Sequence, residues 1–226
     1  MAADSGSVLD LRISVVIPTL NEAACLPALL ADLREVEVIV ADGGSVDATC
    51  SLAHGATVIQ APLGRGSQLA AGARAASGDV LWFLHADTRV PADATVAIRR
   101  ALADPAVGAG NFALRFDGDS RGARWLTWLY PRLGSFGLCY GDSGIFVRRS
   151  VYEQIGGFAA YPIFEDLDLV RRLRQGTRFV HLSPELLTSS RRFEAAGFER
   201  QFAKWCLLQL LYWVGVSPER LGRWYR

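Results

Sequence analysis

The chain has 226 residues, half of them apolar, with 24 basic and 23 acidic side chains. This composition suits one large domain with its own core and excludes a disordered chain, and the near-zero net charge gives no sign of a nucleic-acid partner. The four cysteines form no CxxC pair, and no apolar run reaches the roughly 18 residues that span a bilayer. We therefore expect a cytoplasmic protein with reduced cysteines and no transmembrane segment.

Strand and helix signals alternate through the first half of the sequence. Polar turns follow the apolar, β-branched runs at 13–18, 37–41 and 56–60 and the run that begins at Val80, and helical patterns separate these runs. This spacing of βαβ units predicts an α/β fold with a mostly parallel central sheet flanked by helices. A further helix is expected at 93–103 and a further strand at 109–116.

The run that begins at Val80 ends on His85 and Asp87. These residues are expected at the carboxyl edge of the sheet, where open α/β sheets bind their ligands. A carboxylate beside a histidine can hold a divalent cation, and the cation can hold a phosphate ester. Asp87 could equally cap the turn before Pro91, since Asp is common in turns.

A second acid, Asp42, ends the strand at 37–41 and is followed by a glycine turn. Gly44 permits a tight turn, and Ser45 is expected to cap a short helix that begins near Val46. The acid could accept hydrogen bonds from a base or ribose, but the same residues also make an ordinary strand-to-helix turn. The absence of a GxGxxG motif disfavours dinucleotide binding.

Arg65 precedes a helical pattern of small residues at 66–72. Its guanidinium could contact a phosphate or a carboxylate, whereas the small residues favour close packing of a helix on the sheet. The second half is richer in aromatic side chains, and we expect the segment 116–140 to be a loop that shapes an acceptor site. Those aromatics could form a sugar-stacking wall or belong to the core. They are Trp125, Trp128, Tyr130, Phe136 and Tyr140.

Two further helices are predicted after residue 150. The first ends at Gly156 and Gly157, and the second covers 165–176 with three acids in its first turn. Those acids, Glu165, Asp166 and Asp168, complement the helix dipole. The adjacent pair could also provide a general base beside a cleft.

The C-terminal part is basic and contains tryptophan. Past Ser190 the chain holds seven basic and three acidic side chains, and a helix is expected at 204–214. Such an end could lie on a membrane surface or pack onto the rest of the domain, and the sequence leaves both interpretations open.

Five motifs in this order resemble the inverting family 2 glycosyltransferases of GT-A fold, which transfer a sugar from a nucleotide-diphosphate sugar. They are VVIPTLNE at 15–22, ADGGSVDAT at 41–49, LHADT at 84–88, GDSGIFVRRSVYEQIGGF at 141–158 and FEDLDLVRRLR at 164–174. The tail, with SSRR at 189–192, resembles a small bacterial subgroup associated with arsenosugar biosynthesis and radical-SAM proteins. The resemblance implies a single Rossmann-like GT-A domain over 1–226. It would comprise a nucleotide-binding half at 13–116, an acceptor and catalytic half at 117–190 and a helical tail at 191–226.

The resemblance also implies roles for individual residues. Asp166 would be the catalytic base, with Glu165 orienting it or holding the acceptor together with Asp142 and Gly157. Asp87 would bind Mg2+ or Mn2+, with His85 standing where the family commonly has the first acid of its metal-binding Asp-X-Asp motif. The donor would contact Pro18, Thr19, Glu22, Asp42, Gly44, Asp47, Arg65, Asp87 and Arg191.

Two other functions are weighed against this one. A sugar-phosphate nucleotidyltransferase would also use an α/β sheet and a metal, but the place of its glycine- and lysine-rich loop is taken by IPTLNEAA at 17–24. A non-catalytic protein that binds nucleotide sugars is disfavoured because Asp42, Asp87 and Asp166 are all present. The acceptor is expected to be a small molecule or a lipid-linked molecule, and peripheral contact with a membrane stays open.

Overall fold

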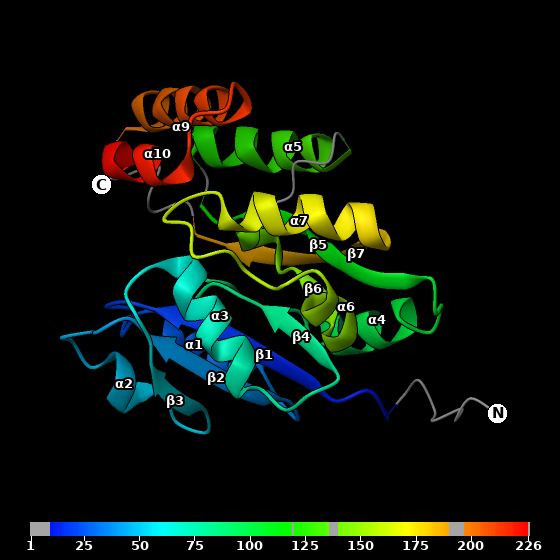
Figure 1. Ribbon diagram of the computed structural model, residues 1–226. Helices are drawn as coiled ribbons and strands as arrows, with labels where there is room; N and C mark the ends of the chain where they lie inside the picture. The colour runs from blue at the N-terminus through cyan, green and yellow to red at the C-terminus, as the bar shows by residue number, and fades with distance from the viewer. Residues whose placement is uncertain (1–9, 119, 136–139, 190–196, 226) are drawn as a thin grey trace.

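A computed structural model describes residues 10–118, 120–135, 140–189 and 197–225. Its centre is a seven-stranded sheet of order β3-β2-β1-β4-β6-β5-β7 (Figure 1). The strands are β1 Ile13–Thr19, β2 Glu37–Asp42, β3 Thr57–Gln60, β4 Val80–Phe83, β5 Val107–Phe116, β6 Phe146–Arg148 and β7 Arg178–Thr188. β3, β2, β1 and β4 pair in parallel, as do β5 and β7, while β6 is antiparallel to both of its neighbours. The predicted mostly parallel α/β sheet is confirmed.

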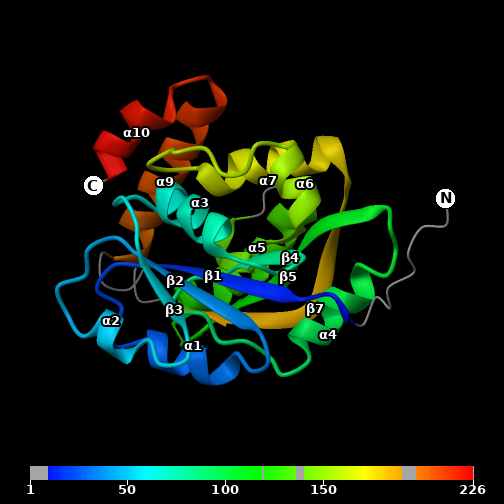
Figure 2. The same ribbon diagram turned by 60° about the horizontal axis from the view of Figure 1, so that its bottom comes forward.

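Helices cover both faces of the sheet because its central strands are apolar on both sides. The helices are α1 Leu26–Asp32, α2 Thr49–Leu52, α3 Arg65–Ala75, α4 Ala94–Ala101, α5 Arg121–Ser135, α6 Arg149–Gln154 and α7 Glu165–Gly176. In β1, Val15 and Ile17 pack with α1, α4 and α5, whereas Val16 packs with α3, α6 and α7. Figure 2 shows α3, α6 and α7 on one side of the sheet and α1, α2 and α4 on the other.

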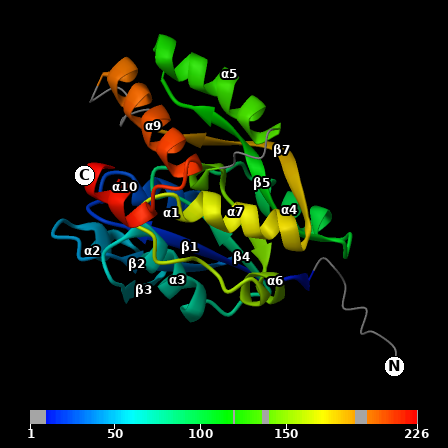
Figure 3. The same ribbon diagram turned by 45° about the horizontal axis from the view of Figure 1, so that its top comes forward.

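The C-terminal segment is helical, as predicted. It consists of α9 Phe198–Trp213 and α10 Pro218–Tyr225, which lie with α5 at one end of the molecule (Figure 3). A small core ties these helices to the start of α7, and it is formed by Tyr140, Ile163, Phe164, Leu167, Leu208 and Leu221. None of the helices in the described ranges is long and apolar enough to cross a membrane.

Three details differ from the sequence prediction. Most of the segment expected to be a loop at 116–140 is the helix α5. The strands β6 and β7 were not predicted. The short helix expected from Val46 begins at Thr49, since the hydroxyl of Ser45 instead donates to Asp42 and accepts the backbone N–H of Asn21.

Candidate functional site

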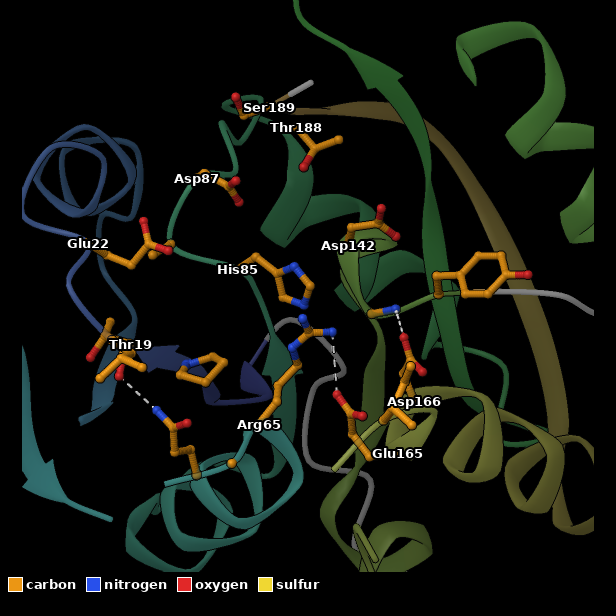
Figure 4. A pocket seen from close by; sticks show the side chains of 18 of the residues that line it. Thr19, Glu22, Arg65, His85, Asp87, Asp142, Glu165, Asp166, Thr188 and Ser189 are labelled. Carbon is orange, nitrogen blue, oxygen red and sulfur yellow. Dashed lines mark hydrogen bonds and ion pairs between the residues drawn. The ribbon is translucent and has the colours of Figure 1, made fainter. Parts of the chain in front are cut away.

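A cavity of about 420 Å³ opens at the carboxyl ends of β1 and β4. The N-termini of α3 and α7 form another part of its wall. Figure 4 shows the side chains that converge there. Many of the predicted site residues line it, namely Pro18, Thr19, Glu22, Arg65, His85, Asp87, Asp142, Glu165 and Asp166. The fold therefore brings the metal, donor-phosphate and base candidates into one cavity.

Glu165 is buried at the start of α7, only 1% exposed, and faces Arg65 from the start of α3. The Arg65 Nη1 and Glu165 Oε1 atoms are 3.5 Å apart. Burial, together with the charge of Asp166, raises the pKa of Glu165 to about 7, although Arg65 opposes the rise. Helix α3 lies close to the start of α7 and to the segment before it because residue 66 is glycine. A Cβ on Gly66 would lie 3.2 Å from the Cβ of Glu165 and 2.6 Å from the carbonyl oxygen of Ala159.

Asp166 is held by two backbone N–H groups. Its Oδ2 accepts from Gly141 at 2.6 Å and its Oδ1 accepts from Leu167 at 2.7 Å. A Cβ on Gly141 would lie 3.1 Å from His85 Nε2 and 3.3 Å from Asp166 Oδ2, so this glycine sits between the two side chains. The two backbone hydrogen bonds hold the carboxylate of Asp166 in place at the cavity (Figure 4).

Asp142 lines the same wall of the cavity as Asp166, and its side chain is partly exposed. Burial and the charges of Asp166 and Asp87 raise its pKa to about 7, against the lowering effect of Arg65. Its Oδ1 is buried and accepts no hydrogen bond within the described ranges. Carboxylates thus crowd one wall of the cavity, and a cation bound there would relieve their repulsion. No three His, Cys, Asp or Glu side chains of the described residues form a ready-made metal site.

Three predicted donor residues, Asp42, Gly44 and Asp47, lie outside the cavity lining. Asp42 is buried at the end of β2 and accepts the Thr19 hydroxyl at 3.1 Å and two backbone N–H groups at 2.9 Å. Burial raises the pKa of Asp42, but hydrogen bonds, above all from Ser45, outweigh it and leave the pKa below its usual value. Asp42 therefore shapes the loop after β2.

Asp47 joins that loop to the one after β1. It accepts the backbone N–H groups of Ala23 at 3.2 Å and Thr49 at 2.9 Å. These hydrogen bonds hold the two loops together beside the part of the cavity that Thr19 and Glu22 line. Nucleotide contact by Asp42, Gly44 and Asp47 stays a prediction.

Gly157, a predicted acceptor residue, also lies away from the cavity. Its φ is +65°, and a Cβ would lie 2.8 Å from the ring of Tyr152. The Tyr152 hydroxyl accepts the Phe158 backbone N–H at 3.1 Å. Gly157 thus allows a tight turn after α6, and the structure gives it no contact with the cavity. Arg191 lies outside the described residues.

Several lining residues were not predicted. Gln68 is buried on α3, and its Nε2 donates to the carbonyl oxygens of Thr19 at 2.8 Å and Ala41 at 2.9 Å. These two hydrogen bonds fix the ends of β1 and β2. The sequence signal that could have indicated Gln68 is a polar residue within a helix made mostly of small residues. The other unpredicted lining residues include Phe116, Thr188, Gln201 and Trp205.

Aromatic side chains form part of the cavity wall. Tyr140 packs on Trp205 with 4.8 Å between ring centroids and on Tyr130 with 5.6 Å. All three line the cavity, whereas Trp125 and Trp128 of the same aromatic set do not. The sequence therefore indicated an aromatic wall but not which rings build it, because Trp205 comes from α9.

Comparison with known proteins identifies the family. The family model described as glycosyl transferase family 2 matches residues 14–156, more than half of the chain. The chain belongs to this family. A comparison with curated proteins finds no match.

Three solved structures illustrate the similarity of the fold. The mannosyltransferase PcManGT from Pyrobaculum calidifontis, in complex with GDP-Man and Mn2+, is 24% identical with a TM-score of 0.62, over 78% of this chain and 56% of that one. S. aureus TarS 1-349 in complex with UDP-GlcNAc is 15% identical with a TM-score of 0.65, over 80% and 59%. Glucosyl-3-phosphoglycerate synthase from Mycobacterium tuberculosis, in complex with Mg2+ and UDP, is 22% identical with a TM-score of 0.65, over 92% and 81%.

The GT-A fold expectation is confirmed by these similarities. The chain spans less than two thirds of the length of the PcManGT and TarS chains. Its resemblance to the arsenosugar-associated subgroup stays a prediction.

Proposed function

We propose that this protein is an inverting glycosyltransferase that moves a sugar from a nucleotide-diphosphate sugar to an acceptor hydroxyl, with help from a divalent cation. The observation that carries the proposal is the position of Asp166. Two backbone N–H groups fix its carboxylate over the cavity, which also holds Arg65, His85 and Asp87. We assign residues 13–116 to the donor half and 117–190 to the acceptor half of the domain.

The donor end of the cavity suits a nucleotide diphosphate. It lies at the carboxyl ends of parallel strands, and Arg65 reaches it from the N-terminus of α3, where partial positive charge favours anions. The related fold in PcManGT was solved with GDP-Man and Mn2+, and that in the M. tuberculosis synthase with UDP and Mg2+. These complexes support the same donor class here.

The residues present fit a magnesium or manganese ion. Mg2+ is commonly held by one or two protein groups together with substrate phosphates, so a preformed three-residue site is not needed. Asp87 and His85 would hold the cation. Burial, together with the negative charges of Asp166 and Asp87, raises the pKa of Asp142, and this crowding of carboxylates supports a cation there. When bound, the ion would supply positive charge that stabilises the leaving diphosphate.

Asp166 would act on the acceptor. The acceptor oxygen attacks the anomeric carbon, the bond from that carbon to the diphosphate oxygen breaks, and the acceptor proton moves to the Asp166 carboxylate. Attack from the face opposite the diphosphate inverts the anomeric configuration. Glu165 would keep Arg65 in place and add negative charge beside Asp166.

The experiment compares two acids of the same helical turn. Asp166→Asn should lower the release of nucleoside diphosphate from the preferred donor by about 10²- to 10⁴-fold. Asp168→Asn is the matched control, because Asp168 does not line the cavity and its Oδ2 lies 2.6 Å from Arg172 Nη2. Full activity of Asp166→Asn would overturn the assignment of the base. Release of pyrophosphate from a nucleoside triphosphate would favour a nucleotidyltransferase instead.

A further inference from the structure

Helix α9 has apolar side chains on two sides. Its inner side, with Trp205 and Leu208, packs toward the cavity and the start of α7. Its outer side carries Leu207 and Leu210, which are 56% and 55% exposed, and Val214 just beyond the helix is 77% exposed. This spacing of three and four residues forms one stripe along the helix. A helix that is apolar on both sides is expected to be covered on both sides.

Helix α5 adds a stripe of arginine and tryptophan beside it. Trp125 and Trp128 are 38% and 52% exposed, and the Arg132 guanidinium lies 4.0 Å over the Trp128 ring. Trp125 joins the two helices, since its ring meets that of Phe202 edge-on with 4.8 Å between centroids. Helix α10 contacts α9 (Figures 1 and 3). Its Trp224 is exposed. We call the exposed side chains of α5, α9 and α10, with Val214, the tail surface.

The tail surface is basic, although the whole chain has a net charge of +1. The three helices carry seven basic and two acidic side chains, so the rest of the chain has more acids than bases. The basic side chains are Arg121, Arg124, Arg132, Arg200, Lys204, Arg220 and Arg223. A second copy docked through the same surface would bring like charges together, which disfavours self-association.

We propose that the tail surface binds the surface of an anionic lipid bilayer. Tryptophan rings suit the boundary between headgroups and acyl chains, arginines bind lipid phosphates through their guanidinium forks, and leucines enter the apolar layer. Four of the six tryptophans are exposed on these helices, namely Trp125, Trp128, Trp213 and Trp224. The same α5 and α9 provide Tyr130 and Trp205 to the cavity wall. Binding would thus place the cavity beside the bilayer.

The test is flotation of the full chain with lipid vesicles, which requires no transferase activity. The protein should float with vesicles of phosphatidylcholine that contain about a quarter phosphatidylglycerol, and less so with pure phosphatidylcholine or in high salt. Leu207→Glu with Leu210→Glu should lower the partition constant at least about tenfold. Arg121→Gln and Arg223→Gln should each lower it about fivefold. Val96→Glu is the control, because Val96 is 41% exposed on α4, away from the tail surface.

Each variant is first checked for native circular dichroism and an unchanged unfolding midpoint, which the exposure of the changed residues leads us to expect. Failure of the wild-type chain to float with anionic vesicles would overturn the proposal. So would undiminished flotation of the Leu207→Glu, Leu210→Glu variant. A dimer that this variant dissociates, without vesicle binding, would show that a second copy covers the surface instead.

Discussion

Replacing Glu165 by glutamine should stabilise the protein at alkaline pH. Glu165 is 1% exposed, and its pKa is raised to about 7, chiefly by burial, from the value of about 4.3 that an unfolded chain gives. Because this pKa is raised in the fold, the contribution of Glu165 to stability is fully present below about pH 4.3 and is lost as the pH rises through about 7. The difference between the folded and the unfolded pKa of Glu165 lowers the free energy of unfolding at pH 8 by an amount of the order of 3 kcal/mol. Glutamine keeps the shape without the charge.

Urea unfolding at pH 5 and pH 8 measures this cost. The free energy of unfolding of Glu165→Gln should exceed that of the wild type by about 3 kcal/mol at pH 8, and the gain should shrink toward pH 5. Glu153→Gln, an exposed change on α6, should stay within about 0.5 kcal/mol at both pH values. If Glu165→Gln were no more stable than the wild type at pH 8, its pairing with Arg65 would outweigh the cost of burial.

Two further predictions concern the surroundings of the cavity. Asp42→Asn should lower stability by about 1 to 3 kcal/mol near neutral pH, because it weakens charge-assisted hydrogen bonds. The pKa of Asp42 is lowered in the fold, so the loss of stability should diminish as the pH falls through that pKa. Urea titrations measure it, and a loss that stays constant down to about pH 2 would contradict the argument. Gly66→Ala should lower the free energy of unfolding by about 1 to 3 kcal/mol, because its Cβ would lie 2.6 Å from a backbone oxygen. Gly176→Ala should lower it far less, because the nearest atom to its Cβ would be 3.7 Å away. Equal thermal midpoints for the two alanine variants would refute the packing argument.

The parallel half of the sheet was predictable because its strands are continuous apolar runs. The residues of β1, β2 and β4 are buried on both faces, so their sequences contain few polar interruptions. Strand β7 lacked that signal. Most of its side chains are partly or fully exposed, it contains Pro184, and its pairing with β5 has register shifts. Its position depends on distant pairing that local sequence does not encode.

Helix α5 was missed for a similar reason. Gly122, Pro131 and Gly134 interrupt its sequence, and these residues are typical of loops. The helix is stabilised by packing, since Ala123 and Leu126 are buried in the core beside the sheet. The tertiary contacts therefore override a weak local preference.

The candidate site was predictable where its residues follow strands. Asp87 and His85 come directly after β4, and the topology alone places them at the cavity. Asp42 is the last residue of β2, but its side chain is used to accept hydrogen bonds from the loop that follows the strand. Trp205 could not be predicted as a lining residue, because only the packing of α9 against Tyr140 places it there.

The most direct test of the proposed function is binding of the donor product with metal. Thermal unfolding would be followed with a panel of nucleoside diphosphates, each with Mn2+, with Mg2+ and with a chelator. The account predicts that one diphosphate stabilises the protein only with a divalent cation, by roughly 2.7 kcal/mol at a hundredfold excess over its dissociation constant. Asp87→Ala should abolish that gain. Absence of stabilisation by every diphosphate, or full stabilisation in the presence of the chelator, would contradict metal-assisted transfer from a nucleotide sugar.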